Sequence, residues 1–305
     1  MDKSEAFKQI IRENRYPPEY IKNLLACLEV SINYGSGLNQ QTALHIAARQ
    51  GDVDMMKMLI SQGAYVNQGT VDLMTPLHEA CLNGHTEAVN LLIAEGADTD
   101  ARNIDGSTPL CFACAKGSVM CTRLLIECGA EVNPSLTVTF PPLHEAALNG
   151  HIPCLEILIE KGADLEKNEN QFGTALHVAC LRGHVECVIV LLQAGANPNS
   201  IKRHQAPLHT TAMNGDEVCT ALLLEYGANV YLRDQQSKKP VDLTTNAVCK
   251  EMLLEAETPP ELLESCRRLI RQQLSCHPRD KIPVLPLPQN LKDYLNHYNY
   301  CTEHY

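Results

Sequence analysis

The hexapeptide TPLHEA at residues 75–80 decides the fold of this chain, because close copies of it recur at a nearly constant spacing. The other copies are TALHIA at 42–47, TPLCFA at 108–113, PPLHEA at 141–146, TALHVA at 174–179 and APLHTT at 206–211. Their leucines are separated by 33 residues four times in succession and then by 32. A period of this length is typical of solenoid proteins, in which each repeat packs only against its neighbours.

Two glycine positions in each unit predict where its helices end. We expect the Thr to cap a first helix and the Pro to occupy its first turn. A Gly seven residues after the Leu then ends this helix, and a Gly-Ala pair 19 residues after the Leu ends a second one. We therefore predict an all-α fold of paired helices with projecting loops. The pattern resembles the ankyrin repeat over residues 40–255, with six clear units and one degenerate unit.

Apolar residues at matching positions indicate how the units stack. One column contains Leu59, Leu92, Leu125, Leu158, Leu191 and Leu223, and another contains Met55, Ala88, Cys121, Cys154, Cys187 and Cys219. Free cysteine packs as a small apolar residue, so we predict that the aligned cysteines fill core volume. Upstream, residues 1–39 contain apolar residues at helical spacing, namely Tyr20, Ile21, Leu24, Leu25 and Leu28. We expect this segment to cap the open end of the stack.

The repeat pattern stops near residue 255, and residues 256–305 follow a different one. Thr258-Pro259-Pro260 interrupts any helix that continues from the repeats. Beyond it, Leu262, Cys266 and Ile270 are four residues apart and lie along one face of a predicted helix. A helix with so much apolar surface needs a partner, which is either another protein or the last repeat.

This carboxyl-terminal segment resembles a SOCS box. The spacing of Leu262, Cys266 and Ile270 matches the elongin-binding pattern, and Leu285-Pro286-Leu287-Pro288 matches the pattern associated with cullin-5. The resemblance implies that elongin C, with elongin B, binds Leu262, Cys266, Leu269 and Ile270. It also implies that cullin-5 with its RING protein binds Leu285, Pro286, Leu287 and Pro288. Family members usually carry Ser, Thr or Pro directly before the Leu, whereas this chain has Glu261.

The whole chain is thus similar to the ankyrin-repeat and SOCS-box protein family, in the branch with about six repeats. The resemblance implies a substrate-recognition adaptor of a cullin-5 type RING ubiquitin ligase, whose ankyrin array binds the target. An ankyrin scaffold without ligase recruitment is the alternative. Pro283-Val284-Leu285-Pro286 also fits P-x-x-P, the minimal ligand of SH3-type grooves, and this interpretation stays open.

Composition narrows the range of partners and compartments. The formal net charge is −11, which argues against nucleic acid and anionic membranes as partners. No run of about 18 apolar residues occurs, so we expect no membrane insertion. The chain has 14 cysteines and an amino terminus, MDKSEAFKQII, that does not read as an export signal. These features predict free thiols and a cytoplasmic or nuclear location.

Catalysis and metal binding are weaker interpretations of the abundant His and Cys. Equivalent positions lie about 10 Å apart along a solenoid, so the repeat histidines cannot converge on one metal. We expect them to hydrogen-bond within the loops; they are His45, His78, His144, His177 and His209. Cys111 and Cys114 form a C-x-x-C, but both occupy repeat positions and no second pair completes a zinc site. We therefore predict no enzyme activity, no cofactor and no metal.

Target contacts are expected at loop positions that depart from the repeat pattern, because packing does not dictate them. The candidates are Tyr65, Gln68, Thr70, Leu73, Arg102, Ile104, Phe140, Asn168, Phe172 and Arg203. Apolar side chains such as Leu73 and Phe172 are costly to expose and would serve as anchors, unless a loop aromatic folds back onto its neighbour. The acidic array suggests a target with a basic patch.

Overall fold

The computed structural model describes residues 3–13, 15–28, 31–35, 39–135, 140–169 and 172–257. Its residues group into two compact units, unit 1 at 1–163 and unit 2 at 164–305. Within the described ranges the secondary structure is helical, apart from two isolated bridges at Glu169–Gly173 and Lys202–Gln205. The predicted all-α class and the pairing of helices are confirmed.

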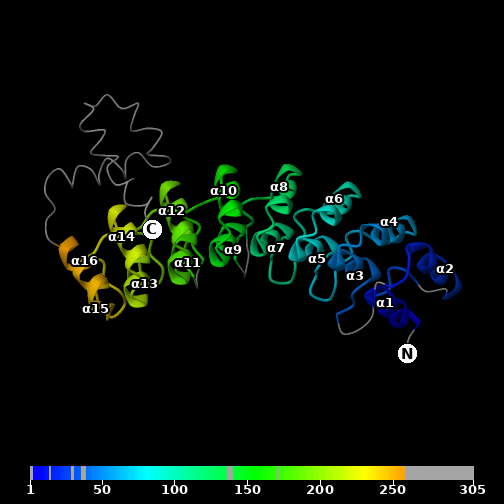
Figure 1. Cartoon of the computed structure of the whole chain (residues 1–305), viewed down its shortest axis with the longest axis horizontal. Coiled ribbons are helices and arrows are strands. Elements are labelled where there is room, and N and C mark those ends of the chain that lie inside the picture. The colour runs from blue at the N-terminus through cyan, green and yellow to red at the C-terminus, as the bar shows by residue number, and fades with distance from the viewer. Residues whose placement is uncertain are drawn as a thin grey trace, which may run out of the picture. The chain divides into compact units, whose positions relative to one another are not determined.

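Unit 1 is a row of helix pairs (Figure 1). Its helices are α1 (Lys3–Glu13), α2 (Pro18–Leu28), α3 (Ala43–Gln50), α4 (Val53–Ser61), α5 (Pro76–Asn83), α6 (Thr86–Ala94), α7 (Pro109–Lys116), α8 (Val119–Glu127), α9 (Pro142–Asn149) and α10 (Ile152–Glu160). The first helices of the repeats, α3, α5, α7 and α9, pack side by side as an inner layer. The second helices, α4, α6, α8 and α10, form an outer layer in the same way.

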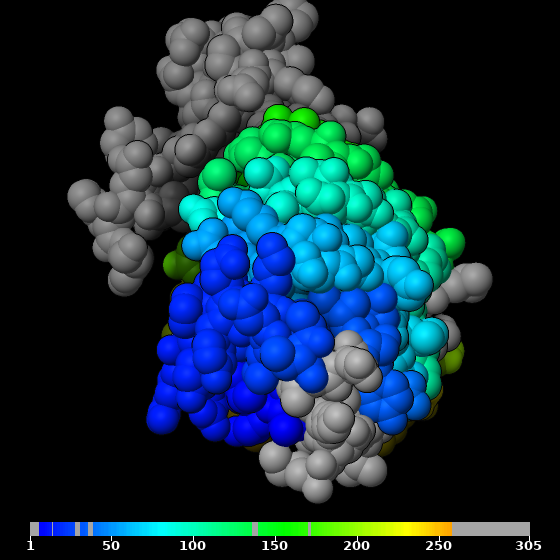
Figure 2. Space-filling view, turned by 90° about the vertical axis from the view of Figure 1, so that its right-hand side faces the viewer, coloured from blue at the N-terminus to red at the C-terminus, as the bar shows by residue number. Residues whose placement is uncertain are grey.

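The amino-terminal pair continues both layers of unit 1. Helix α1 packs on α3, and α2 packs on α4. Figure 2 views this end of the chain and shows the first helices in dark blue in front of the following repeats. Phe7, Ile11 and Ile21 are at most 1% exposed, so they supply the apolar surface that α1 and α2 bury.

Unit 2 repeats the same design with its own helices. They are α11 (Ala175–Arg182), α12 (Val185–Gln193), α13 (Pro207–Asn214), α14 (Glu217–Glu225), α15 (Pro240–Leu243) and α16 (Ala247–Glu257). The inner helices α11, α13 and α15 pack in sequence, and so do the outer helices α12, α14 and α16. The four-residue α15 corresponds to the degenerate last repeat that the sequence predicted.

The predicted columns form the core of each unit. The six repeat leucines, Leu44, Leu77, Leu110, Leu143, Leu176 and Leu208, are at most 3% exposed. The column that begins with Leu59 is fully buried, and the column that contains the four aligned cysteines is at most 2% exposed. Packing rather than reactivity therefore accounts for these cysteines, as predicted.

A glycine ends each inner helix because the chain must turn sharply beside the next repeat. At Gly51 φ is +72°, a left-handed conformation that costs glycine little. A Cβ atom at this position would lie 2.6 Å from the ring of His85, so a larger residue would also clash with the neighbouring repeat. The requirement for Gly here is both conformational and steric.

Capping boxes begin the inner helices α3, α5 and α11. Thr75 occupies the N-cap position of α5, where it forms a capping box with His78. Nδ1 of His78 accepts the Thr75 N–H at 3.1 Å and lies 2.9 Å from the Thr75 hydroxyl. The predicted N-cap position of Thr75 is confirmed, and the imidazole three residues later reaches back to it.

Candidate target-binding surface

Histidine side chains hold three loops of the array against the preceding helix. Nδ1 of His45 accepts the Thr42 N–H, so Nε2 carries the proton and donates to the carbonyl of Met74 in the next repeat at 2.8 Å. His78 binds the Ser107 carbonyl and His177 binds the Gln205 carbonyl in the same way, each at 3.2 Å. The predicted hydrogen bonding to the loops is confirmed for His45, His78 and His177.

Burial keeps these bridging imidazoles neutral. It lowers the pKa of His45 to about 4 and that of His78 to about 4, and the carbonyl partners offset this only in part. A neutral ring can accept at Nδ1 and donate at Nε2 at the same time, which the bridge requires. The histidines are therefore structural groups that position the loops.

Asparagines form a second set of bridges between neighbouring loops. Nδ2 of Asn67 donates to the Gly96 carbonyl at 2.9 Å, and its Oδ1 accepts the Asp98 N–H at 2.8 Å. Asn33 and Asn199 each make the same pair of bonds to the repeat that follows. Each amide uses its donor and its acceptor together, so it fixes the spacing of two consecutive loops.

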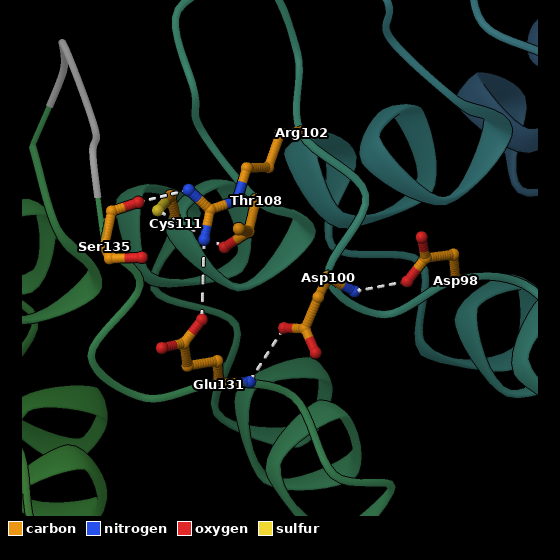
Figure 3. A network of polar contacts seen from close by, with 7 residues as sticks. All are labelled: Asp98, Asp100, Arg102, Thr108, Cys111, Glu131 and Ser135. Carbon is orange, nitrogen blue, oxygen red and sulfur yellow. Dashed lines mark hydrogen bonds and ion pairs between the residues drawn. The ribbon is translucent and has the colours of Figure 1, made fainter.

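The next repeat lacks this amide and uses a different network (Figure 3). Asp100 accepts the Glu131 N–H at 2.8 Å, but a carboxylate has no donor for the following Gly carbonyl. The Arg102 guanidinium points toward the next loop, where it binds the Ser135 carbonyl and lies 3.5 Å from Glu131. The guanidinium of Arg102, a candidate target contact, therefore donates its hydrogen bonds to groups within the array.

The loop at 64–75 closes on Thr70. Thr70 donates its N–H to the Met74 carbonyl at 2.9 Å, and its hydroxyl accepts the Met74 N–H at 3.2 Å. Thr70 is only 4% exposed, so this candidate stabilises the loop and offers little surface to a partner. The same turn holds Leu73 at φ +58°, a conformation that is uncommon for a leucine.

Three apolar side chains project from the tips of two neighbouring loops. Val71, Leu73 and Ile104 are 51%, 53% and 65% exposed, and we call them the fingertip patch. The Ile104 N–H donates to the Asp72 carbonyl at 2.9 Å, which joins the two tips. Exposed apolar groups held together in this way are typical of protein-binding surfaces. Two of the three, Leu73 and Ile104, were candidates from the sequence.

The remaining candidates of unit 1 differ in their exposure and in their contacts. Tyr65 is 67% exposed, with its N–H bound to Asn33. Gln68 is half-buried and donates to the Asn33 carbonyl at 2.9 Å, so it supports the loop. Phe140 is half-buried and stacks on His144 with ring centroids 6.3 Å apart. Phe140 thus follows the alternative in which a loop aromatic folds back onto its neighbour.

Unit 2 places its three candidates around a second loop pair. Asn168 is exposed and donates from Nδ2 to the Ile201 carbonyl at 3.0 Å. Phe172 is half-buried, and Nζ of Lys202 lies 5.6 Å from its ring centroid. Arg203 is exposed in a left-handed conformation at φ +45°. Ile201, which is 52% exposed, adds an apolar side chain that the sequence analysis did not select.

Sequence reasoning also missed a variable position on the inner helices, which is partly exposed on α7, α9 and α13 and buried on α3, α5 and α11. The residue after each repeat histidine, or after its replacement Cys111, is not constant: it is Ile46, Glu79, Phe112, Glu145, Val178 and Thr210 in successive repeats. Leu82 on α5 is 41% exposed. We call Glu79, Leu82, Phe112, Glu145 and Leu148 the inner face of unit 1. The signal was available, since variation within a regular repeat marks positions where the residue is not fixed by the repeat itself.

The cysteines of the described ranges are free thiols, and burial makes several of them unreactive. It raises the pKa of Cys81, Cys114 and Cys180, which lowers the fraction of the nucleophilic thiolate. Cys111 and Cys114 of the C-x-x-C are both buried, with Cys111 Sγ 3.5 Å from the Thr108 hydroxyl. Within the part of the chain that the structure describes, no group of three His, Cys, Asp or Glu is arranged to hold a metal.

The predicted ligase-binding residues lie outside the described residues. This applies to Leu262, Cys266, Leu269 and Ile270 of the elongin-binding pattern and to Leu285, Pro286, Leu287 and Pro288 of the cullin-binding pattern. Among the described helices, none has the length and apolar character needed to cross a lipid bilayer.

Stacked helix pairs with histidine-bridged and asparagine-bridged loops define an ankyrin-repeat protein, a class whose arrays are interaction modules rather than catalysts. The comparisons agree: a family model described as ankyrin repeats (three copies) matches residues 9–103, 95–169 and 143–234. A SOCS box model matches residues 258–296. The chain therefore belongs to the ankyrin-repeat family and carries a SOCS box at its carboxyl-terminal end.

A solved structure supports this assignment. The chain is similar to the ankyrin repeat domain of human ASB11, with 38% sequence identity and a TM-score of 0.67. The similarity covers 72% of this chain and 100% of that domain. No curated protein matched the chain.

Proposed function

We propose that this chain is the substrate-recognition subunit of a cullin-5 type RING ubiquitin ligase. The observation that carries the proposal is the union of an ankyrin array and a SOCS box in one polypeptide. One module binds a target and the other recruits the ligase, so the chain needs no catalytic residues of its own. Its effect on rate is to hold a target lysine near the charged ubiquitin carrier and raise its effective concentration.

The SOCS box would supply the contacts to the ligase. Leu262 inserts into an apolar pocket of elongin C, and Cys266, Leu269 and Ile270 extend the same helix face. Burying a leucine stabilises such a contact by roughly 1.5–3 kcal/mol. Leu285 to Pro288 then add the contact to cullin-5, while elongin B binds elongin C. Free thiols in the described ranges fit the reducing cytosol or nucleus, where this machinery would operate.

The ankyrin loops would bind the target. In unit 1 the fingertip patch and Tyr65 provide the exposed apolar contacts, and in unit 2 Asn168, Ile201 and Arg203 provide a second set. Thr70, Gln68 and Arg102 support these loops from within the array. Anchors of this kind contribute most of the binding energy when a partner covers them fully.

Co-purification with elongins B and C tests the proposal. The intact chain is expected to retain both elongins, and Leu262→Ala combined with Cys266→Ala is expected to lose them. The matched control is Glu264→Ala combined with Arg268→Ala, because helical periodicity puts these two residues on the opposite face of the same predicted helix. This control should retain the elongins.

Two outcomes would contradict the proposal. If the intact chain retains no elongin, the protein is an ankyrin scaffold without ligase recruitment. If the Leu262 and Cys266 variant unfolds the array, measured by circular dichroism, the helix is a cap for the last repeat. If the intact chain retains the elongins and the double variant loses them while staying folded, affinity capture with the double variant should accumulate the target. The target would then be bound but not ubiquitinated.

A further inference from the structure

The inner face of unit 1 contains two acidic residues at the same repeat position, two repeats apart. Glu79 on α5 and Glu145 on α9 each follow the repeat histidine, and Phe112 occupies the same position on α7 between them. Helix α7 packs against both α5 and α9. The order along this face is therefore carboxylate, aromatic ring, carboxylate.

Both carboxylates lack a cation. Glu79 accepts a 3.3 Å hydrogen bond from the Gln41 amide, and Glu145 accepts one of 3.5 Å from the Asn149 amide. Neither forms an ion pair with any residue of the described ranges. Glu79 is nevertheless only 7% exposed, and buried acidic side chains are normally paired.

The electrostatic surroundings show that this arrangement is costly for the free protein. Burial raises the pKa of Glu79, although Arg49 on α3 lowers it in part. Burial also raises the pKa of Glu145 to about 7, which the hydrogen bond from Asn149 reduces only in part. Lys116 is the cationic residue of α7, and Cys111 and Cys114 on that helix have raised pKa values and stay neutral. A cation from outside would remove much of this cost.

Apolar groups accompany the two carboxylates. Phe112 is partly exposed, with the edge of the His78 ring against it at a centroid distance of 5.6 Å. Leu82 is 41% exposed, and Leu148 is half-buried at the matching position of α9. A partner must therefore offer apolar contacts in the centre and positive charge on both sides.

Helix spacing sets the distance between the two charges. Packed helices lie about 8–10 Å apart, so α5 and α9, separated by α7, are roughly 16–20 Å apart. An extended chain advances about 3.3 Å per residue and alternates its side chains, so side chains on one face are an even number of residues apart. Six residues of extended chain span roughly 20 Å.

We propose that the inner face of unit 1 binds an extended segment of a partner protein that carries two basic side chains six residues apart and an apolar side chain between them. The basic groups pair with Glu79 and Glu145, and the apolar group lies against Phe112. This inference deepens the proposed function by giving the chemistry of the target, and it rests on that function for the identification of the partner as a ligase target.

Binding of such a segment is coupled to proton release. Only the charged form of Glu145 pairs with a cation, and with its pKa near 7 the charged fraction rises between pH 6 and pH 8. The affinity should therefore be about tenfold weaker at pH 6 than at pH 8. Arginine does not titrate in this range, so an arginine-containing probe isolates the contribution of the carboxylates.

The test is a titration of the full chain with the heptapeptide Arg-Ala-Leu-Ala-Leu-Ala-Arg, capped at both ends, observed by NMR through the methyl groups of Leu82 and Leu148. We expect saturable shifts at pH 8, about tenfold weaker binding at pH 6, and no saturation when citrulline replaces both arginines. A hexapeptide with the arginines five residues apart should bind at least fivefold more weakly, because odd spacing places them on opposite faces.

Matched variants separate a specific site from general attraction to an acidic protein. Glu79→Gln with Glu145→Gln should weaken binding at least tenfold, whereas Glu87→Gln with Glu156→Gln removes the same charge from the outer helices α6 and α10 and should leave affinity unchanged. Equal loss in both variants, equal binding of the citrulline peptide, or no binding at all would overturn the proposal. A preference for the hexapeptide would overturn the extended geometry.

This titration uses neither elongin nor cullin, so its failure is distinct from failure of the proposed function. The Glu79 and Glu145 variant should still co-purify with elongins B and C if the SOCS box works as proposed. If the chain binds the peptide but not the elongins, the inner face is a binding site of an ankyrin scaffold that recruits no ligase.

Discussion

The leucine columns and the fingertip patch of unit 1 use similar side chains for opposite purposes. Leu92 on α6 is completely buried between repeats, whereas Ile104 is 65% exposed only 12 residues later. The core position recurs in every repeat because each interface needs the same volume. The tip position varies because no neighbour fills it. Regularity in this chain therefore marks stability, and the departures from it that are exposed mark surfaces that are free to bind.

The largest expected effect breaks the core side of this comparison. Leu92→Ala should reduce the free energy of unfolding by about 2–5 kcal/mol, because it leaves a cavity between stacked helices. Ile104→Ala removes a similar side chain from a loop tip and should change stability by less than about 0.5 kcal/mol. Urea denaturation of both variants measures the difference. Equal losses would mean that the tip packs as part of the core.

Acidification should weaken the histidine bridges that connect core and loops. The pKa of His78 is about 4 in the folded chain, below the ordinary value of 6.5, so the unfolded chain binds the proton more tightly. The contribution of neutral His78 to the free energy of unfolding is therefore fully present above pH 6.5. It falls by about 3 kcal/mol as the pH drops toward 4. His45 contributes in the same direction.

Measuring the urea midpoint from pH 7 to pH 4.5 tests this dependence. His78→Gln should lower stability at pH 7, since the bonds to Thr75 and Ser107 are lost, and should flatten the pH profile. The control His204→Gln changes an exposed loop histidine and should keep the profile of the parent chain. An unchanged slope in His78→Gln would show that the acid sensitivity comes from other groups.

The sequence alone predicted the repeated part of the fold because its determinants are local. The spacing of Leu44 and its equivalents, the glycine at position 51 and the column that begins with Leu59 each constrain one repeat and its neighbour. Stacking then extends these constraints along the chain. The role of His45 in bridging was also predictable, since a buried imidazole needs partners for both nitrogens.

The loop surface was predicted less completely, for a physical reason. Loop conformation depends on single side-chain to backbone bonds that no other repeat shares. Thr70 looked like a surface residue, yet its hydroxyl closes a turn. Arg102 looked like a target contact, yet it replaces the bridge that Asp100 cannot make. Leu73 and Ile104 were selected correctly as exposed side chains, because apolar residues at loop tips have no core to enter.

Glu145 on the inner face extends the comparison between core and binding surface, because this proposed binding residue should lower the stability of the fold. The pKa of Glu145 is about 7, above the ordinary value of 4.5, so its charge destabilises the fold increasingly as the pH rises from 4.5 to 7. Glu145→Gln should therefore stabilise the array at pH 8, by about 1 kcal/mol after allowance for solvent screening. At pH 5 the gain should be close to zero. Urea denaturation at the two pH values measures it, and a pH-independent gain would contradict the assignment.

A smaller effect is expected from exchanging the two types of loop bridge. Asn67→Asp removes the donor to the Gly96 carbonyl and should cost about 0.5–1.5 kcal/mol. Asp100→Asn supplies a donor at the equivalent place in the next repeat and should gain a similar or smaller amount. Thermal denaturation of both single variants gives the comparison. Destabilisation by Asp100→Asn would show that the Arg102 network depends on the carboxylate.

The smallest effect on stability, with the clearest effect on binding, is expected at Leu73. Its left-handed backbone at φ +58° is uncommon for leucine but well tolerated by asparagine. Leu73→Asn should therefore leave the array equally stable or up to about 0.5 kcal/mol more stable, while removing an exposed apolar group from the fingertip patch. Target capture from lysate, quantified against the parent chain, should fall.

Val248→Asn, at a residue 42% exposed on α16, is the control for general surface polarity and should capture the target normally. Unchanged capture by Leu73→Asn would mean that the strained loop serves the array rather than the partner, and would remove the fingertip patch from the proposed binding surface.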